Sequence, residues 1–278
     1  MPVEVQNLVY PIKNVRTPGK GTILNIDKLQ IKDGEFVGII DAGEGGASSL
    51  GKILCGLISP DTGVLSVTGP DGKQPAVSVF FDCECEKTVS EASVEKEISR
   101  RITSAGEKKD AVSAKAKAAS ELVGLDYAAV KNRSPFELSV ADRRKIVLAA
   151  ALASQPELLV LNEPMKDMDG LWCSELMKLL KSVNGSGTTV ILLTADTSRP
   201  AEYADRIILM KNGGIVVDST AKNVFSEYYS LIHLGLPVPE VRKCCQMLRK
   251  QGMDMPNNII LYDQFIDRLK ILMWRKNK

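Results

Sequence analysis

The chain has 278 residues, of which 44% are hydrophobic and 25% charged, enough for one large domain or two modest ones. Lysine and arginine number 36 against 34 acidic residues, so the net charge of +2 gives no excess that would indicate nucleic-acid binding. No apolar run reaches the roughly 18 residues of a membrane-spanning helix, and the N-terminus lacks the basic start of a signal peptide. We therefore expect a soluble, cytoplasmic protein that binds no nucleic acid and reaches a membrane only through a partner.

Short apolar runs rich in valine, isoleucine and leucine alternate with helical patterns along most of the chain. The runs predict strands at residues 2–9, 36–40, 158–161, 189–193, 206–210 and 214–217. The last two flank Lys211-Asn212-Gly213 and predict a hairpin. Helical patterns occupy 91–124, with a stripe of Val112, Ala116, Ala119 and Val123, and 140–153. Strands that alternate with helices indicate an α/β fold with parallel strands.

A glycine-rich loop follows the strand at 36–40. It reads DAGEGGASS over residues 41–49 and leads into a helical pattern through Leu57. A strand, a glycine loop and a helix in this order form an anion-binding helix N-terminus. The loop stands where a phosphate-binding P-loop would stand.

The composition changes after about residue 220. Two helical patterns follow, separated by Leu236-Pro237-Val238-Pro239. The second carries apolar residues at helical spacing and predicts an amphipathic helix. These residues are Tyr262, Phe265, Ile266, Leu269, Leu272 and Met273. We expect 221–278 to form a small helical extension.

Five degenerate motifs occur in the order and at the separations found in one protein family. They are DAGEGGASS (41–49) for the Walker A loop, LSVAD (138–142) for the LSGGQ signature, LLVLNE (158–163) for Walker B, 166–169 for the D-loop, and Thr194-Ala195-Asp196 for the switch. On these motifs the chain resembles the ATP-binding subunits of ABC transporters, and most of all the ATPase subunits of energy-coupling factor (ECF) vitamin importers.

The resemblance implies a fold, domains and partners. The fold is a P-loop NTPase (ABC ATPase) fold, with a nucleotide-binding domain at 1–220, a helical subdomain at about 91–145 and an ECF-type helical extension at 221–278. The cofactors are ATP and Mg²⁺. The partners are a homologous ATPase subunit, with which the chain forms a dimer, and an integral membrane transporter subunit. The chain is then cytoplasmic and peripheral at the inner face of the cell membrane.

The resemblance also identifies candidate site residues. Nucleotide-binding positions of the degenerate Walker A loop and signature are Gly43, Gly45, Gly46, Ala47, Ser48, Ser49 and Ser139. Ser48 and Asn162 stand at Mg²⁺ positions, and Glu163 stands where the general base that polarises attacking water is found.

The sequence departs from the family pattern where side chains would touch the nucleotide. Ala47 replaces the P-loop lysine, while Asp41 and Glu44 add negative charge. A charge pair at 4 Å is worth about 4 kcal/mol at an effective dielectric near 20, and repulsion costs similarly, so ATP binding is predicted to be weak or absent. Asn162 lacks the charge that a hard cation prefers, and Ala195 replaces the switch histidine.

Four other residues bear on the site. Ser139 and Asp142 have the spacing of a capping box, which stabilises a helix without any phosphate. Phe81 falls where the Q-loop glutamine is expected. Lys52, five residues beyond Ala47 on the same helix, is expected to point to a different face and not to replace the missing lysine.

We therefore predict a degenerate ATP-binding subunit of an ECF-type ABC importer. It would have weak or no ATP hydrolysis and would act as a structural or regulatory partner of an active ATPase subunit. One alternative is a functional ATPase that energises vitamin or metal uptake with atypical motifs. Another is a soluble regulator that uses the altered cleft for a different ligand, where Asp41 and Glu44 would favour a cation.

Overall fold

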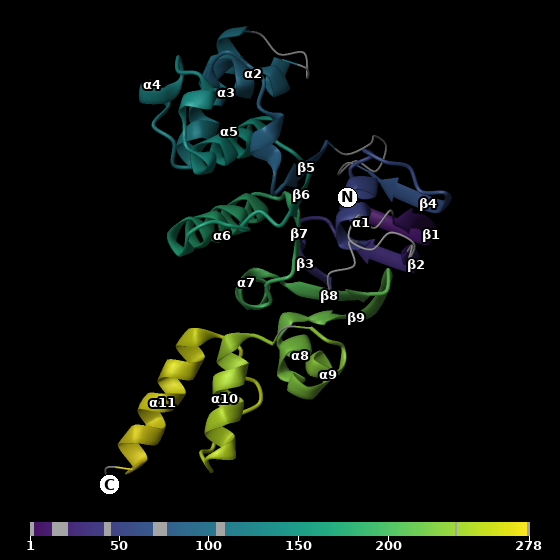
Figure 1. The fold of residues 1–278 in the computed structure, drawn as a ribbon, viewed down its shortest axis with the longest axis vertical. Coiled ribbons are helices and arrows are strands. Elements are labelled where there is room, and N and C mark those ends of the chain that lie inside the picture. Colours follow the sequence, from purple (N-terminus) through teal and green to yellow (C-terminus); the bar gives the residue numbers. More distant parts are fainter. Residues whose placement is uncertain are drawn as a thin grey trace.

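The computed structural model describes residues 3–12, 22–41, 46–68, 77–103, 109–236 and 238–276. Within these residues the strands form two sheets, one in the order β2-β1-β4 and one in the order β5-β6-β7-β3-β8-β9. Helices cover both faces of the larger sheet (Figure 1). The α/β fold predicted from the sequence is confirmed.

The larger sheet occupies the centre of the molecule. Its strands are β5 (Ser78–Asp82), β6 (Leu158–Asn162), β7 (Thr189–Thr194), β3 (Phe36–Asp41), β8 (Arg206–Lys211) and β9 (Gly214–Thr220). Neighbouring strands pair in parallel except β8 and β9, which form the predicted antiparallel hairpin. The central strands are buried along most of their length because packed layers lie on both faces, and this explains their continuous apolar runs.

The smaller sheet is antiparallel. It consists of β1 (Val3–Ile12), β2 (Thr22–Ile31) and β4 (Thr62–Val67). The sequence predicted the first strand, but it predicted neither β2 nor β4, nor β5 in the larger sheet. These strands are only partly buried, so they lack the continuous apolar run that revealed the central strands.

Helix α1 (Gly46–Leu54) lies between the two sheets. Leu50 and Ile53 are fully buried in a core that both sheets share. The helix ends at Leu54, before the predicted end at Leu57. The reason is Gly56, which adopts a φ of +69° while the N–H of Leu57 donates to the carbonyl of Lys52 at 2.9 Å, so that the backbone leaves the helix in a Schellman turn.

The other helices of the main body pack on the opposite face and on the β5 edge. They are α2 (Val94–Thr103), α3 (Lys109–Leu122), α4 (Tyr127–Val130), α5 (Val140–Ala153), α6 (Gly170–Gly185), α7 (Ser198–Tyr203), α8 (Ala221–Ser226) and α9 (Tyr228–His233), with the 3-10 turns η1 (Cys85–Thr88) and η2 (Pro135–Glu137). Helices α2 to α5 form a separate group beyond β5 (Figure 1). The stripe predicted for this group, from Val112 to Val123, is buried.

Two further helices extend from the other end of the molecule. They are α10 (Glu240–Lys250) and α11 (Tyr262–Lys276), and they share a small core of Cys245, Met255 and Ile259. The helix predicted over α11 is confirmed, but Tyr262 and Met273 of its apolar stripe are 67% and 66% exposed, whereas Phe265 and Leu272 pack against the small core that α11 shares with α10. No helix among the described residues is long and apolar enough to cross a membrane.

Candidate functional site

The candidate site lies at the carboxyl ends of the parallel strands, where β3 leads into α1. Gly43 and Gly45 of the predicted Walker A loop, and Glu44 between them, lie outside the described residues. Gly46 and Ala47 form the buried start of α1, and Ser48 and Ser49 are half-buried in its first turn.

The last residue of β3 reaches back to the start of α1. The Oδ2 atom of Asp41 accepts a hydrogen bond from the backbone N–H of Ala47 at 3.0 Å. A Cβ atom built on Gly46 would lie 3.5 Å from the same oxygen, so the carboxyl group lies against the first turn of the helix. Backbone N–H groups at a helix start have no partner within the helix and attract negative charge. Asp41 supplies both the acceptor and the charge.

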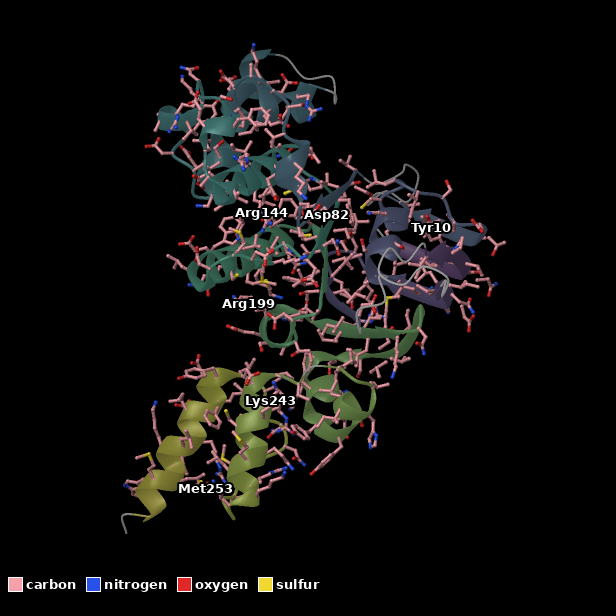
Figure 2. The ribbon with its side chains drawn as sticks, viewed as in Figure 1. Tyr10, Asp82, Arg144, Arg199, Lys243 and Met253 are labelled. Carbon is pink, nitrogen blue, oxygen red and sulfur yellow. The ribbon has the colours of Figure 1, made fainter. Side chains whose placement is uncertain are left out.

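A second group joins α1 to the ends of β5 and β6. The Nδ2 atom of Asn162 donates to Ser48 Oγ at 3.3 Å and to Asp82 Oδ2 at 3.4 Å. Asp82 and Asn162 are register partners at the ends of their strands, so the sheet itself brings the two side chains together. Figure 2 shows Asp82 where the sheet meets helices α2 to α5.

The residue from β5 that reaches this group is Asp82, and the assignment of Phe81 to the Q-loop position is wrong. Phe81 is 2% exposed because its side chain packs in the main hydrophobic core. Successive side chains of a strand point to opposite faces, so the next residue, at the strand end, takes the position beside Asn162. Sequence reasoning missed Asp82. The signal in the sequence was that Asp82 is the first charged residue after an apolar run.

Glu163 bridges the ends of β6 and β7. Its Oε1 atom accepts from the N–H of Ala195 at 2.7 Å, and its Oε2 atom accepts from the hydroxyl of Thr194 at 3.0 Å. Its backbone adopts a φ of +47°, and its N–H donates to the carbonyl of Leu193 at 2.8 Å. The carboxyl group is therefore held against Thr194 and Ala195 at the end of β7.

Ser139 does not join these groups. It is the N-cap of α5, where its Oγ atom accepts from the N–H of Asp142 at 3.1 Å and donates to Asp142 Oδ2 at 2.8 Å. Both bonds stay within the first turn of α5, as the capping interpretation predicted. Val140, which the sequence predicts at the position of a signature glycine, is 47% exposed.

One buried arginine connects α5 to the region around the site. The Nε atom of Arg144 lies 3.0 Å from Glu86 Oε2 in η1, and its Nη1 atom donates to the carbonyl of Lys166 at 2.5 Å. Lys166 belongs to the segment that follows Glu163. Arg144 therefore links three chain segments that border the strand ends (Figure 2).

The two cysteines that follow β5 are protonated thiols when no metal is bound. Burial, together with Asp82, raises the pKa of the Cys83 thiol to about 11, and burial raises that of Cys85 to about 12, so neither forms a thiolate readily at neutral pH. Among the described residues, no group of three or more His, Cys, Asp or Glu side chains is arranged to hold a metal ion.

The Nζ atom of Lys52 lies over the ring of Phe80, 5.9 Å from its centroid, and the residue lines a groove beside β5.

Comparisons with known proteins identify relatives of this chain. A family model described as "ABC transporter" matches residues 24–166. The energy-coupling factor transporter ATP-binding protein EcfA2 of Clostridium perfringens is 30% identical over 287 residues, which cover 100% of both chains. The corresponding protein EcfA1 of Caldanaerobacter subterraneus is 30% identical over 276 residues, covering 95% of this chain and 97% of the relative.

Solved structures with the same fold are also ABC proteins. One is cbiO1 from Clostridium perfringens, described as part of the ABC transporter complex cbiONQ. It aligns with a TM-score of 0.66 at 23% identity, covering 86% of this chain and 96% of that chain. The dimeric bacterial ABC transporter cassette MJ0796 aligns with a TM-score of 0.66 at 21% identity, covering 79% and 98%. At these identities the likeness shows the P-loop NTPase fold of ABC cassettes and nothing further.

Proposed function

The chain belongs to the ATP-binding subunits of ABC transporters of the energy-coupling factor type, and on that premise we propose that it is a subunit with weak or no ATP hydrolysis. Its role is then structural or regulatory: it pairs with an active homologous ATPase subunit and docks with it on an integral membrane subunit. It acts at the inner face of the cell membrane through those partners.

The observation that carries the proposal is the engagement of Glu163. A general base must aim a free lone pair at the water molecule that it deprotonates. Here one oxygen of the carboxyl group accepts from the N–H of Ala195 and the other accepts from the hydroxyl of Thr194. These two bonds hold the carboxyl group against the end of β7, so it could activate water only from this fixed orientation, through the lone pairs that the two bonds leave open.

Two alanines support the same conclusion. Ala47 stands where a lysine would place a charge on the phosphates, and Ala195 stands where a histidine would face the reacting centre. Neither methyl group can donate a hydrogen bond or carry a charge. Catalytic groups act as a unit, so losing several of them removes more than the retained Glu163 can restore.

The proposed partners rest on what the relatives are. Two ATP-binding proteins of Caldanaerobacter subterraneus, EcfA1 and EcfA2, are each 30% identical to this chain, so one organism holds two homologous subunits of this type. The cbiO1 structure is described as part of a transporter complex, and the MJ0796 cassette is dimeric. A homologous ATPase subunit and a membrane subunit are therefore the partners that we propose.

Steady-state ATP hydrolysis tests the proposal. We expect the purified chain at saturating MgATP to turn over no faster than its Glu163→Gln variant, because the carboxyl group contributes no catalysis. Turnover at least about tenfold above that variant, corresponding to about 1.4 kcal/mol of transition-state stabilisation, would instead establish a working ATPase with Glu163 as its base. Glu175→Gln, a substitution on α6 outside the site, is the matched control for a change of charge alone.

A further inference from the structure

At the start of α1 and at the ends of β5 and β6, side chains of the protein itself make the hydrogen bonds that a bound ligand would otherwise make. A phosphate at a helix N-terminus needs backbone N–H donors, and a divalent cation beside it needs free oxygen ligands. We infer that Asp41 substitutes for the phosphate and Asn162 substitutes for the cation. The group formed by Asp41, Ala47, Ser48, Asp82 and Asn162, here called the cradle, then has its hydrogen bonds satisfied without MgATP.

The phosphate side depends on the N–H of Ala47. This group is the second backbone donor of α1, and it already donates to Asp41 Oδ2 at 3.0 Å. The same oxygen lies 3.5 Å from the point that a Cβ on Gly46 would occupy, so the carboxyl group stands in front of the first helical turn. An incoming phosphate would meet a negative side chain at the donor it needs, with Ala47 offering no charge to offset the repulsion. The residues present therefore do not fit a triphosphate.

The cation side depends on the amide of Asn162. A hard cation in this position would coordinate the hydroxyl of Ser48 and the carboxyl group of Asp82. The Nδ2 atom of Asn162 lies 3.3 Å and 3.4 Å from these two oxygens and donates to both. Because an amide NH₂ has two hydrogens and no acceptor, it satisfies the oxygens and cannot ligate a metal. Without a cation, rotating the amide would bring its carbonyl oxygen against the Asp82 carboxyl group, so the donating orientation is the favoured one.

The inference deepens the proposed function and rests on it, because it concerns the same nucleotide cradle. It adds a specific property: the start of α1 is ordered by Asp41 when no nucleotide is present. A homologous partner would then meet a cradle whose conformation is independent of MgATP. Asp41 and Asn162 are then the two residues that exclude MgATP, the ligand of the family, from the cradle.

Amide hydrogen exchange of Ala47 in the full chain, followed by NMR with and without MgATP, tests the phosphate side. We expect the wild-type amide to be protected without nucleotide and to gain no protection from MgATP. Asp41→Ala should raise its exchange rate about tenfold, the effect of losing one hydrogen bond to a charged group, and MgATP should reverse the change. Asp41→Asn keeps an acceptor oxygen and should stay near wild type. Unchanged exchange in a folded Asp41→Ala variant, or wild-type protection by MgATP, would overturn the inference.

Melting curves with Mg²⁺ alone test the cation side, and they also decide the matter if Asp41→Ala does not fold. Asn162→Asp replaces the donor with a second carboxyl group next to Asp82, so MgCl₂ should raise the melting temperature of this variant and leave that of the wild type unchanged. An equal rise in the wild type contradicts the inference. ATP hydrolysis is not measured in either experiment, so a wild-type chain that hydrolyses ATP refutes the proposed function separately.

Discussion

Arg144 of α5 and Glu86 of η1 form a buried ion pair in which Nε lies 3.0 Å from Oε2 and only 6% and 12% of the two side chains are exposed. The same guanidinium donates to the carbonyl of Lys166 in the segment after Glu163. One side chain therefore holds the α2 to α5 group, the turn after β5 and the loop after β6 in a single arrangement.

Replacing Arg144 should destabilise the protein strongly. In Arg144→Met the carboxyl group of Glu86 remains buried without its cation, and the carbonyl of Lys166 loses its donor. Breaking a buried ion pair by removing one partner costs about 3–5 kcal/mol. Urea unfolding of the wild type and the variant measures this loss.

An exposed ion pair provides the matched control. Arg133 lies 3.5 Å from Glu137, and the two side chains are 50% and 61% exposed. Arg133→Met should cost no more than about 1 kcal/mol, because solvent screens such pairs. Equal losses for Arg133→Met and Arg144→Met would show that the buried pair between α5 and η1 stabilises the protein no more than an exposed pair does.

Gly51 permits the close approach of α1 to the larger sheet. A Cβ atom at this position would lie 2.6 Å from Leu193 Cδ1 and 3.0 Å from Val160 Cγ1. Gly51→Ala should therefore lower the free energy of unfolding by about 1–3 kcal/mol through overpacking. Gly185→Ala is the control, because a Cβ there meets nothing within 4 Å in the described structure and alanine favours the helix by about 0.5–1 kcal/mol. The prediction fails if thermal or urea unfolding gives the two alanine variants the same stability.

The sequence predicted the fold where one physical signal dominates. The strands β3, β6, β7 and β8 are buried on both faces, so they appear as continuous apolar runs. In β2 only alternate residues such as Leu24 and Ile26 are buried, while Ile23 is 55% exposed, which weakens the same signal. Strand β4 has no fully buried residue at all within its described length, so its position depends on pairing with β1.

The site was predictable in its position and less so in its contacts. The strand, loop and helix order located α1, and the Walker B segment located Asn162 and Glu163. The contact of Asp82 with Asn162 depends on the pairing of two strands 80 residues apart, and sequence patterns carry no register of that kind. The bond from the N–H of Ala47 to Asp41 joins the end of β3 to the first turn of α1, and residue spacing alone does not predict such a contact.

Glu97 should make the free energy of unfolding depend on pH. Burial raises its pKa, but N–H groups of Ser90 and Glu91 and the guanidinium of Arg100 outweigh burial and lower the pKa below its ordinary value of 4.5. A carboxyl group whose pKa is lowered in the folded state stabilises the protein fully above the unfolded value. That contribution disappears as pH falls through the lowered folded value.

Urea unfolding between pH 7 and pH 3 measures this contribution. Glu97→Gln should lose about 1.5–3 kcal/mol at pH 7, the usual contribution of hydrogen bonds to a charged group. The difference from wild type should shrink as pH falls below about 4, because the wild-type carboxyl group then becomes neutral as well. Glu121→Gln on the exposed face of α3 serves as the control and should change little at any pH. A loss from Glu97→Gln that is the same at pH 7 and pH 3 would contradict the prediction.

Ser139 stabilises the start of α5 by capping it, and its contribution should not depend on nucleotide. Removing its Oγ atom leaves the N–H of Asp142 without an acceptor, and such a change costs about 1 kcal/mol. Ser139→Ala should therefore lower the free energy of unfolding by this amount, both with and without MgATP. Ser139→Asn keeps a side-chain acceptor and should lose only a few tenths of a kcal/mol. If MgATP increases the loss caused by Ser139→Ala, then the hydroxyl contacts nucleotide and the capping interpretation is incomplete.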